Sequence, residues 1–301
     1  FEETRPDYVI LEAGLGGRYD ATHVGNPLVT AFTHIDLDHT EVLGDTLDLI
    51  AREKACVIPQ GGNVVIAPQT DAARNVILAV AEDRGARVLD VGSYYNVQQV
   101  SHSPRGTDFT VASPDGGFYG LHINMLGTFQ ITNAITALGV IECLMDQGLQ
   151  ISRDNIVLGL ANARWPGRLE PIYTQPLTVL DGGHNLDGFR ELAKNLPLFF
   201  TWGRLHLIIA ITGNKPVEAM LGAVLPLADT VTFTSPRRSR TKPIARDYLN
   251  QVATKFNIEA AEAPDFSKAY NNVLAQAHKD DLICVCGSLY LIGEARGELL
   301  D

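Results

Sequence analysis

Short apolar runs alternate with amphipathic helical segments along most of this 301-residue chain. Apolar runs typical of strands occur at 7–12, 28–35, 63–67, 87–91, 177–181, 205–211, 230–234 and 281–286. Apolar spacing of three or four residues predicts helices at 46–58, 71–84, 130–147, 153–163, 186–197, 215–225, 243–255 and 265–278. Because strands that alternate with helices build parallel sheets covered by helices, we predict an α/β fold.

Two segments interrupt this alternation and divide the chain. Residues 94–124 are polar and alternating, and the turn sequence at 113–117 predicts a small β-ribbon. The sequence Trp165-Pro166-Gly167-Arg168 is typical of a linker. A chain of this length can form two domains. We therefore predict one domain over 1–169 and a second α/β domain over 170–301.

Composition excludes several classes of protein. Apolar residues make up 46% of the chain and the net charge is −11, which argues against a surface for nucleic acid or anionic membrane. No apolar stretch reaches the roughly 18 residues of a membrane helix, and no signal peptide is visible. Cys284 and Cys286 alternate within an apolar strand, which favours buried thiols over a metal or redox pair and fits a cytoplasmic protein. The chain begins with Phe1, so we expect a fragment of a longer protein.

Three side chains in the first domain could carry chemistry. Glu12 ends an apolar run before the glycine loop 14–17, where it could bind a cation or simply accept loop N–H groups. His39 follows the run 28–35 and could be a metal ligand, a base or a hydrogen-bonded loop histidine. Lys54 lies on the apolar stripe of its helix, so it either snorkels to the surface or is a buried amine with a lowered pKa. Such an amine can react with carbon dioxide to give an anionic carbamate.

Seven blocks in order along the chain resemble the signature of the folylpolyglutamate synthase and dihydrofolate synthase family of Mur ligases. They are Leu11-Glu12-Ala13-Gly14-Leu15-Gly16-Gly17-Arg18-Tyr19-Asp20-Ala21-Thr22, Leu37-Asp38-His39-Thr40-Glu41-Val42-Leu43-Gly44, Ile50-Ala51-Arg52-Glu53-Lys54-Ala55, Gly127-Thr128-Phe129-Gln130-Ile131-Thr132-Asn133-Ala134, Trp165-Pro166-Gly167-Arg168-Leu169-Glu170, Asp181-Gly182-Gly183-His184-Asn185 and Gly287-Ser288-Leu289-Tyr290-Leu291-Ile292-Gly293-Glu294. The resemblance implies the last part of a Mur-type ATPase domain followed by a Rossmann-like ligase domain.

The resemblance also implies an activity. ATP would phosphorylate a carboxylate of dihydropteroate or folate, and L-glutamate would attack the acyl phosphate to form an amide. Mg²⁺ would neutralise the phosphates, held by Glu12, His39 and a carbamylated Lys54. Such an enzyme would work in the cytoplasm as a monomer, with small-molecule substrates and neither nucleic acid nor membrane as partner.

Further contacts follow from the same resemblance. Asn133 would bind adenine (its alternative is a helix cap), and Arg168 would bind ATP phosphates (its alternative is an interdomain salt bridge). Asp181 would contact ribose or orient Arg168, and His184 would touch phosphate. Without the resemblance these two are a loop cap and a solvated histidine. Domain closure through a hinge at 164–170 would complete the site.

The remaining substrate contacts are expected at three positions. Asp20 matches the family position near the pterin. Ser288 is a candidate for the glutamate side, although a serine after a glycine can also cap a helix. Lys215 at a helix start is a possible anion contact.

The chain also departs from the family pattern. None of its seven lysines follows a glycine, so the Gly-Lys-Ser or Gly-Lys-Thr phosphate-binding loop is absent. We therefore expect this chain alone to bind ATP poorly and to have no ligase activity. Departures at single positions are His23, Asp36, Cys56 and Phe129.

Two alternatives stay open. One is another Mur-type amino-acid ligase acting on a cell-wall precursor or a similar acid, and the other is a non-catalytic binding or scaffold fragment. The sequence does not decide whether the enzyme makes dihydrofolate, extends polyglutamate or does both.

Overall fold

The computed structural model describes residues 3–300, which divide into two compact units. Unit 1 contains residues up to 99, 109–121 and 131–160, and unit 2 contains 100–108, 122–130 and the residues from 161 onward. The division is interleaved around the segment 100–130, whereas the sequence suggested a single boundary after 169. That boundary stays a prediction, and each unit is described by itself.

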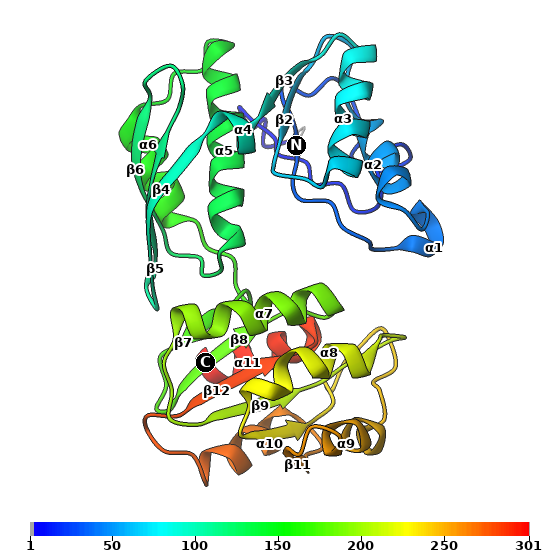
Figure 1. Cartoon of the computed structure of the whole chain (residues 1–301), viewed down its shortest axis with the longest axis vertical. Coiled ribbons are helices and arrows are strands. Elements are labelled where there is room, and N and C mark those ends of the chain that lie inside the picture. Colours follow the sequence, from blue (N-terminus) through cyan, green and yellow to red (C-terminus); the bar gives the residue numbers. More distant parts are fainter. Residues whose placement is uncertain (1–2, 301) are drawn as a thin grey trace. The chain divides into compact units, whose positions relative to one another are not determined.

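Unit 1 contains a parallel sheet of three strands in the order β1-β2-β3 (Figure 1). The strands are β1 (Thr30–Phe32), β2 (Asn63–Ile66) and β3 (Arg87–Asp90). The helices that lie wholly or mainly in this unit are α1 (Thr40–Leu43), α2 (Leu47–Ala55), α3 (Asp71–Asp83), α4 (Val91–Tyr94), α5 (Phe129–Asp146) and α6 (Arg153–Asn162). Helices α2 and α3 begin where the side chains of Thr46 and Thr70 accept backbone N–H groups, which is the preferred way to start a helix.

Helices cover both faces of this sheet. Ile50, Ala51 and Ala55 of α2 are buried in one core with Val64 and other residues of β1, β2 and α3. On the other face α5 approaches so closely that a Cβ on Gly139 would lie 2.8 Å from the side chain of Val91. Packing therefore requires a glycine at position 139 of α5, and the sheet lies between two layers of helices.

The strand predicted at 7–12 is wrong. Residues 8–13 have no regular secondary structure, and the side chains of Tyr8, Val9, Ile10 and Leu11 are exposed, Ile10 at 97%. A strand needs a neighbour that accepts its backbone hydrogen bonds. Within residues 3–300 the sheet ends at β1, and no strand pairs with this run.

Three further strands form the predicted ribbon. They are β4 (Asn96–Ser103), β5 (Gly106–Ala112) and β6 (Phe118–Ile123), in the order β4-β5-β6. The predicted turn at 113–117 is confirmed, since the Ser113 N–H donates to the Gly117 carbonyl at 2.9 Å.

Unit 2 contains a six-stranded sheet in the order β11-β10-β9-β12-β8-β7, and all neighbours are parallel except β7 and β8. Its strands are β7 (Glu170–Ile172), β8 (Leu177–Asp181), β9 (Leu205–Ile209), β10 (Thr230–Phe233), β11 (Glu259–Glu262) and β12 (Leu282–Cys286). Its helices are α7 (Leu186–Phe199), α8 (Val217–Val224), α9 (Arg246–Thr254), α10 (Phe266–Leu274) and α11 (Leu289–Leu300), with a 3₁₀ turn η1 (Leu225–Leu227) after α8.

Alternate residues of these strands enter two separate cores. Leu207, Cys284 and Cys286 pack against α7, α8 and α9, whereas Ile208 and Val285 pack against α10 and α11. This is the two-residue period of a sheet covered on both faces. The prediction that Cys284 and Cys286 are buried free thiols is confirmed. No helix within residues 3–300 is long and apolar enough to span a bilayer.

A buried polar network ties the amino ends of three strands of unit 2. His206 is fully buried, with Nδ1 2.8 Å from Thr230 Oγ1 and Nε2 3.2 Å from Asp281 Oδ2. Asp281 also accepts the N–H groups of Arg204 and His278. Burial raises the pKa of Asp281, but the hydrogen bonds from His278, His206 and Arg204 outweigh it, so the net shift is downward.

We predict that Asp281→Asn lowers the free energy of unfolding by about 2 kcal/mol at neutral pH, because buried donors lose a charged acceptor. Since the folded-state pKa is depressed, this stabilisation is present at neutral pH and is lost as the pH falls through that pKa. The difference from wild type should therefore shrink below about pH 4. Urea unfolding at several pH values measures it. Asp280→Asn, at an exposed neighbour, is the control, and an equal loss in both variants would contradict this account.

Candidate functional site

The glycine loop of unit 1 is held by one carboxylate. Asp20 Oδ2 accepts the N–H groups of Gly14 and Leu15, both at 2.9 Å. Its Oδ1 accepts the N–H of Thr22 at 2.9 Å and the Thr22 hydroxyl at 2.6 Å. These bonds, led by the Thr22 hydroxyl, hold the pKa of Asp20 well below its usual range. Asp20 therefore acts as the fixed point of the loop in this structure, and its predicted contact with a pterin stays a prediction.

The loop is also pressed onto the end of α2. Gly16 has a φ of +66°, and a Cβ on Gly17 would lie 2.8 Å from the carbonyl oxygen of Glu53. The Glu53 carboxylate in turn pairs with Arg18 at 3.2 Å. Only glycine fits both positions, so the backbone of the loop can lie beside the last turn of the helix that carries Lys54.

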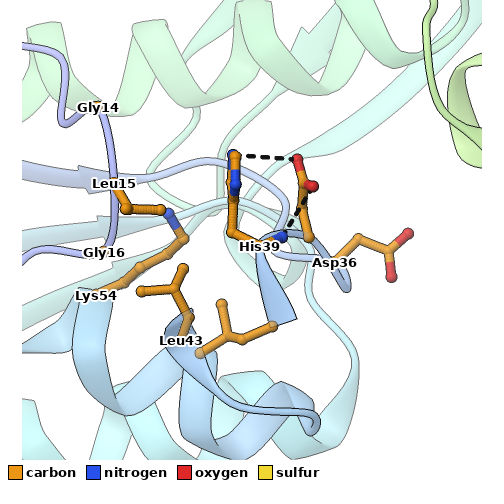
Figure 2. A pocket seen from close by; sticks show the side chains of 9 residues that line it. Gly14, Leu15, Gly16, Asp36, His39, Leu43 and Lys54 are labelled. Atoms are coloured by element: carbon orange, nitrogen blue, oxygen red, sulfur yellow. Dashed lines mark hydrogen bonds and ion pairs between the residues drawn. The ribbon is translucent and has the colours of Figure 1, made fainter. Parts of the chain in front are cut away.

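A cavity of about 160 Å³ lies between this loop, the residues at 36–39 that follow β1, and helices α1 and α2 (Figure 2). Its lining residues are Gly14, Leu15, Gly16, Asp36, Asp38, His39, Leu43, Ile50 and Lys54. The structure therefore brings His39 and Lys54, two of the three residues predicted to hold the cation, to a single cavity.

His39 stands at the first turn of α1 in a left-handed conformation, with φ of +50°. Its N–H donates to Asp38 Oδ1 at 2.9 Å, and its Nε2 lies 3.9 Å from Asp38 Oδ2. A non-glycine residue rarely adopts this conformation, and where it does the surroundings hold it there. The imidazole is 55% exposed and lines the cavity, so it is accessible to a ligand.

Lys54 is half-buried at the end of α2, one turn after the fully buried Ile50. Figure 2 shows its side chain extending from α2 toward the loop at Gly14–Gly16. This half-buried position lies between the two alternatives that the sequence left open. Its carbamylation stays a prediction.

Glu12 is exposed and is not among the residues that line the cavity, although it precedes the lining residue Gly14 by two positions. Within residues 3–300, no three His, Cys, Asp or Glu side chains are arranged to hold a metal ion. The sequence prediction missed Asp36 and Asp38 as cavity carboxylates. The available signal was their spacing, which places both within three residues of His39.

A second group of predicted residues gathers at the end of β8 in unit 2. Asp181 accepts the N–H of Gly183 at 2.8 Å and the N–H of Leu169 at 3.0 Å. Burial raises the pKa of Asp181, while these N–H groups and the charge of Arg168 act in the opposite direction. The structure thus brings Arg168 and Asp181 together and also shows the loop-capping role that the sequence left open.

Loop 181–185 is further bound to the predicted linker. The Gly182 N–H donates to the Gly167 carbonyl at 2.6 Å, and Asn185 caps α7 by accepting the Gly188 N–H at 2.8 Å. His184 is exposed, with Nδ1 3.1 Å from the Gly182 carbonyl. The loop therefore fixes Nδ1 of the imidazole. The other nitrogen, Nε2, makes no hydrogen bond within residues 3–300.

Ser288 lies at the same edge of the unit 2 sheet. Asp181 is paired in register with Cys286 of β12, and Ser288 follows two residues later, after Gly287 at a φ of +97°. The Ser288 hydroxyl is buried without a hydrogen-bond partner in the described chain, so it does not cap α11. A buried hydroxyl without a partner costs free energy, and the predicted contact of Ser288 with glutamate stays a prediction.

Two other predicted residues lie beside or within a helix. Lys215 precedes α8 and is partly buried. Asn133 lies inside α5, four residues after its first residue Phe129, so its alternative role as a helix cap is wrong.

Comparison with known proteins identifies the family. The Mur ligase middle domain matches residues 1–141, and the Mur ligase glutamate ligase domain matches residues 167–289. The dihydrofolate synthase/folylpolyglutamate synthase of Bacillus subtilis (strain 168) is 31% identical over 297 residues, which is 97% of this chain and 67% of that protein. The chain belongs to this Mur ligase family.

Other members agree with this assignment. The folylpolyglutamate synthase of Lacticaseibacillus casei is 31% identical, with 100% of this chain and 68% of that protein covered. The structure of Mycobacterium tuberculosis folylpolyglutamate synthase complexed with ADP and AMPPCP has a TM-score of 0.87 at 28% identity, covering 99% of this chain and 70% of that chain. The predicted α/β fold and the resemblance are confirmed. This chain spans about two thirds of these relatives and 35% of a probable bifunctional relative from Haloferax volcanii.

We predict that Asp20→Asn loosens the glycine loop, because one carboxylate serves four donors and a neutral amide accepts them less well. Amide hydrogen exchange at Gly14, Leu15 and Thr22 should become faster than in wild type. The control is Asp7→Asn at an exposed position of the same unit. Unchanged exchange at all three amides would show that Asp20 does not hold the loop.

Proposed function

We propose that this chain is part of an ATP-dependent ligase that joins L-glutamate to dihydropteroate, to folate or its polyglutamates, or to both. The observation that carries the proposal is the cavity in which His39 and Lys54 meet the glycine loop. The names of the relatives supply the substrate class, and a related structure with ADP and AMPPCP supports the use of ATP.

In the proposed reaction, a carboxylate oxygen of the acid substrate attacks the γ-phosphorus of ATP, and ADP leaves. The amine of L-glutamate then attacks the acyl carbon, and the carbon–nitrogen bond of the amide forms. The carbon–oxygen bond to phosphate breaks, inorganic phosphate leaves, and the amine gives up a proton. Little of this chemistry requires a covalent contribution from the protein, so positioning and charge neutralisation provide the catalysis.

Five of the predicted residues have a place in this scheme. The Arg168 guanidinium would bind phosphate oxygens while Asp181 orients it, and His184 would add a phosphate contact. Asn133 would bind adenine. The Ser288 hydroxyl would donate a hydrogen bond to the incoming glutamate or accept one from it. Its burial without a hydrogen-bond partner among the described residues supports this role.

Mg²⁺ fits the cavity only as a partly hydrated ion that arrives with the nucleotide. The described residues offer no three-residue donor set, and Mg²⁺ in nucleotide sites usually takes one or two protein ligands together with water and phosphate oxygens. His39 and a carbamylated Lys54 would be its two protein ligands at the cavity, and Glu12, which does not line the cavity, is the third residue that the resemblance proposes. When bound, it would neutralise phosphate charge.

The Lys54 carbamate can be tested by substitution. In the polypeptide encoded by the complete gene, Lys54→Ala and Lys54→Arg should each lower glutamate-dependent ADP release at least about 100-fold, because neither can supply the anionic oxygen. Arg52→Ala, an exposed neighbour on the same helix, should leave the rate unchanged. Wild-type protein in ¹³C-bicarbonate should give a carbamate carbon signal that Lys54→Arg lacks. Full activity of Lys54→Arg would exclude the carbamate.

The 301-residue chain itself should release no ADP, because it has no Gly-Lys-Ser or Gly-Lys-Thr sequence to cradle phosphates. The measurement is ADP formation with ATP, L-glutamate and, in parallel, dihydropteroate, a folate and a muramoyl peptide. Glutamate-dependent ADP release by this chain would contradict the prediction. With the complete polypeptide, turnover of the muramoyl peptide alone would contradict the proposed substrate class.

A further inference from the structure

A basic segment with two hydroxyl side chains stands out in this acidic chain. Residues 237–242 read Arg-Arg-Ser-Arg-Thr-Lys, which places four cations within six positions of a chain with net charge −11. The segment follows β10 and is neither helix nor strand, and five of its six residues are exposed. Nothing in the proposed reaction uses it.

The two hydroxyl side chains of the segment differ in their surroundings. Ser239 is half-buried, and its hydroxyl donates to the Thr241 carbonyl at 2.7 Å and accepts the Thr241 N–H at 3.3 Å. The Thr241 side chain is exposed, and its hydroxyl has no hydrogen-bond partner within residues 3–300. Ser239 therefore fixes the backbone of Thr241, while the Thr241 hydroxyl is accessible to a reagent from solvent.

Thr241 also lines a groove that has room for an added group. The groove has a volume of about 680 Å³, and its lining residues are Gly213, Asn214, Thr241, Lys242, Pro243, Ile244 and Ala245. A Cβ on Gly213 would lie 3.9 Å from Thr241 Oγ1, so the hydroxyl lies beside the backbone of Gly213 without touching it. A phosphate group on Thr241 would therefore enter open space and would not displace packed side chains.

The four cations of the segment fall into two kinds. Arg237 forms ion pairs of 3.2 and 3.8 Å with two carboxylates on other segments of unit 2. Arg238, Arg240 and Lys242 are exposed, and none of their side chains has a carboxylate within ion-pair distance in the part of the chain that the structure describes. Arg238 lies three residues before Thr241, and the other two cations flank it. The accessible hydroxyl thus lies among three cations that are available to a partner.

We propose that Thr241 is a phosphorylation site for a serine/threonine kinase that selects arginine before its acceptor. Charge pattern is one of the features by which kinases choose their substrates, and a kinase with an acidic substrate groove fits a segment of this kind. Arg238 and Arg240 can pair with such a kinase without breaking an ion pair of this chain. The half-buried Ser239, whose hydroxyl is already bonded on both sides, is the poorer acceptor.

The reaction needs only the kinase and its ATP. Thr241 Oγ1 attacks the γ-phosphorus, and a new oxygen–phosphorus bond forms. The bond from this phosphorus to the bridging oxygen of ATP breaks, and ADP leaves. A carboxylate of the kinase accepts the proton of the hydroxyl.

The cations that recruit the kinase would then hold its product. A phosphothreonine carries a charge of about −1.5 to −2 at neutral pH and accepts charge-assisted hydrogen bonds from arginine and lysine. Arg240 and Lys242 are its direct neighbours in the sequence. Phosphorylation would therefore order an exposed segment at the carboxyl edge of the unit 2 sheet, where ligands of α/β proteins gather.

The acceptor is tested on the 301-residue chain in vitro. The chain is incubated with ATP and a purified kinase that selects arginine three residues before its acceptor, and tandem mass spectrometry locates the phosphate. Wild type and Ser239→Ala should gain a phosphate on Thr241, and Thr241→Val should gain none. Arg238→Ala should lower kcat/KM of the kinase for this chain about tenfold, because a charge-assisted contact is lost. Arg190→Ala, at an exposed arginine of α7, is the control and should leave it unchanged.

Hydrogen exchange tests the role of the cations. Amides at 238–242 should exchange more slowly in the phosphorylated chain than in the unmodified chain, and added KCl should reduce this difference. Phosphorylated Lys242→Ala should lose part of the protection, whereas phosphorylated Lys268→Ala, at an exposed lysine of α10, should keep it. Thermal unfolding of all unmodified variants should coincide with that of wild type, since every substituted side chain except Ser239 is exposed.

Four results would overturn the proposal. They are no phosphate on wild type, a phosphate on Ser239 in place of Thr241, an equal rate of phosphorylation for wild type and Arg238→Ala, and equal exchange at 238–242 in the phosphorylated and unmodified chains. None of these measurements depends on glutamate-dependent ADP release. Failure here would therefore leave the proposed ligase function untouched, and failure of that function would leave the phosphorylation site untouched.

Discussion

The cavity of unit 1 depends on one carboxylate that organises a loop. Asp20 accepts four donors from Gly14, Leu15 and Thr22, and so fixes the path of a backbone that has no regular structure of its own. This fixed point acts together with the Arg18–Glu53 ion pair and the close packing of Gly17 to hold the glycine loop beside α2. With it, the loop and the ends of α1 and α2 enclose a small volume that His39 and Lys54 line. The bonds also lower the pKa of Asp20, so the carboxylate stays charged well into the acidic range.

Unit 2 uses the same principle at the end of β8. Asp181 is the last residue of a buried strand, and its two oxygens bind one N–H on its own loop and one on the segment after Arg168. The Asp181 carboxylate therefore stabilises the loop. It also keeps Arg168 near the strand end at which Ser288 follows two residues after Cys286, the register partner of Asp181. In both units the carboxylate positions other groups that could meet a ligand.

Most of the fold follows from the sequence because buried parallel strands and amphipathic helices have strong, different periods. Strands β8, β9, β10 and β12 and helices α7 to α10 lie near their predicted positions, and the predicted turn at 113–117 is present, whereas β7 and α11 were not predicted. The exposed edge strand β11 was missed because its Glu-Ala-Ala-Glu sequence carries no apolar pattern. The prediction of a strand at 7–12 failed for the opposite reason. The run has the apolar pattern of a strand, but a strand forms only where a neighbouring strand pairs with it.

The candidate site was predictable only in part. Residue types and order pointed to His39 and Lys54, and the structure places both at one cavity. The role of Asp20 as the loop anchor and the presence of Asp36 and Asp38 at the cavity depend on how a loop closes, which no periodicity encodes. The central claim, that this cavity holds the cation of a bound nucleotide, is tested most directly by pulsed electron paramagnetic resonance with Mn²⁺ and AMPPCP on the polypeptide that the complete gene encodes. The account predicts coupling of Mn²⁺ to a histidine nitrogen that disappears in His39→Gln. Nucleotide-bound Mn²⁺ whose spectrum is the same in both proteins would contradict it.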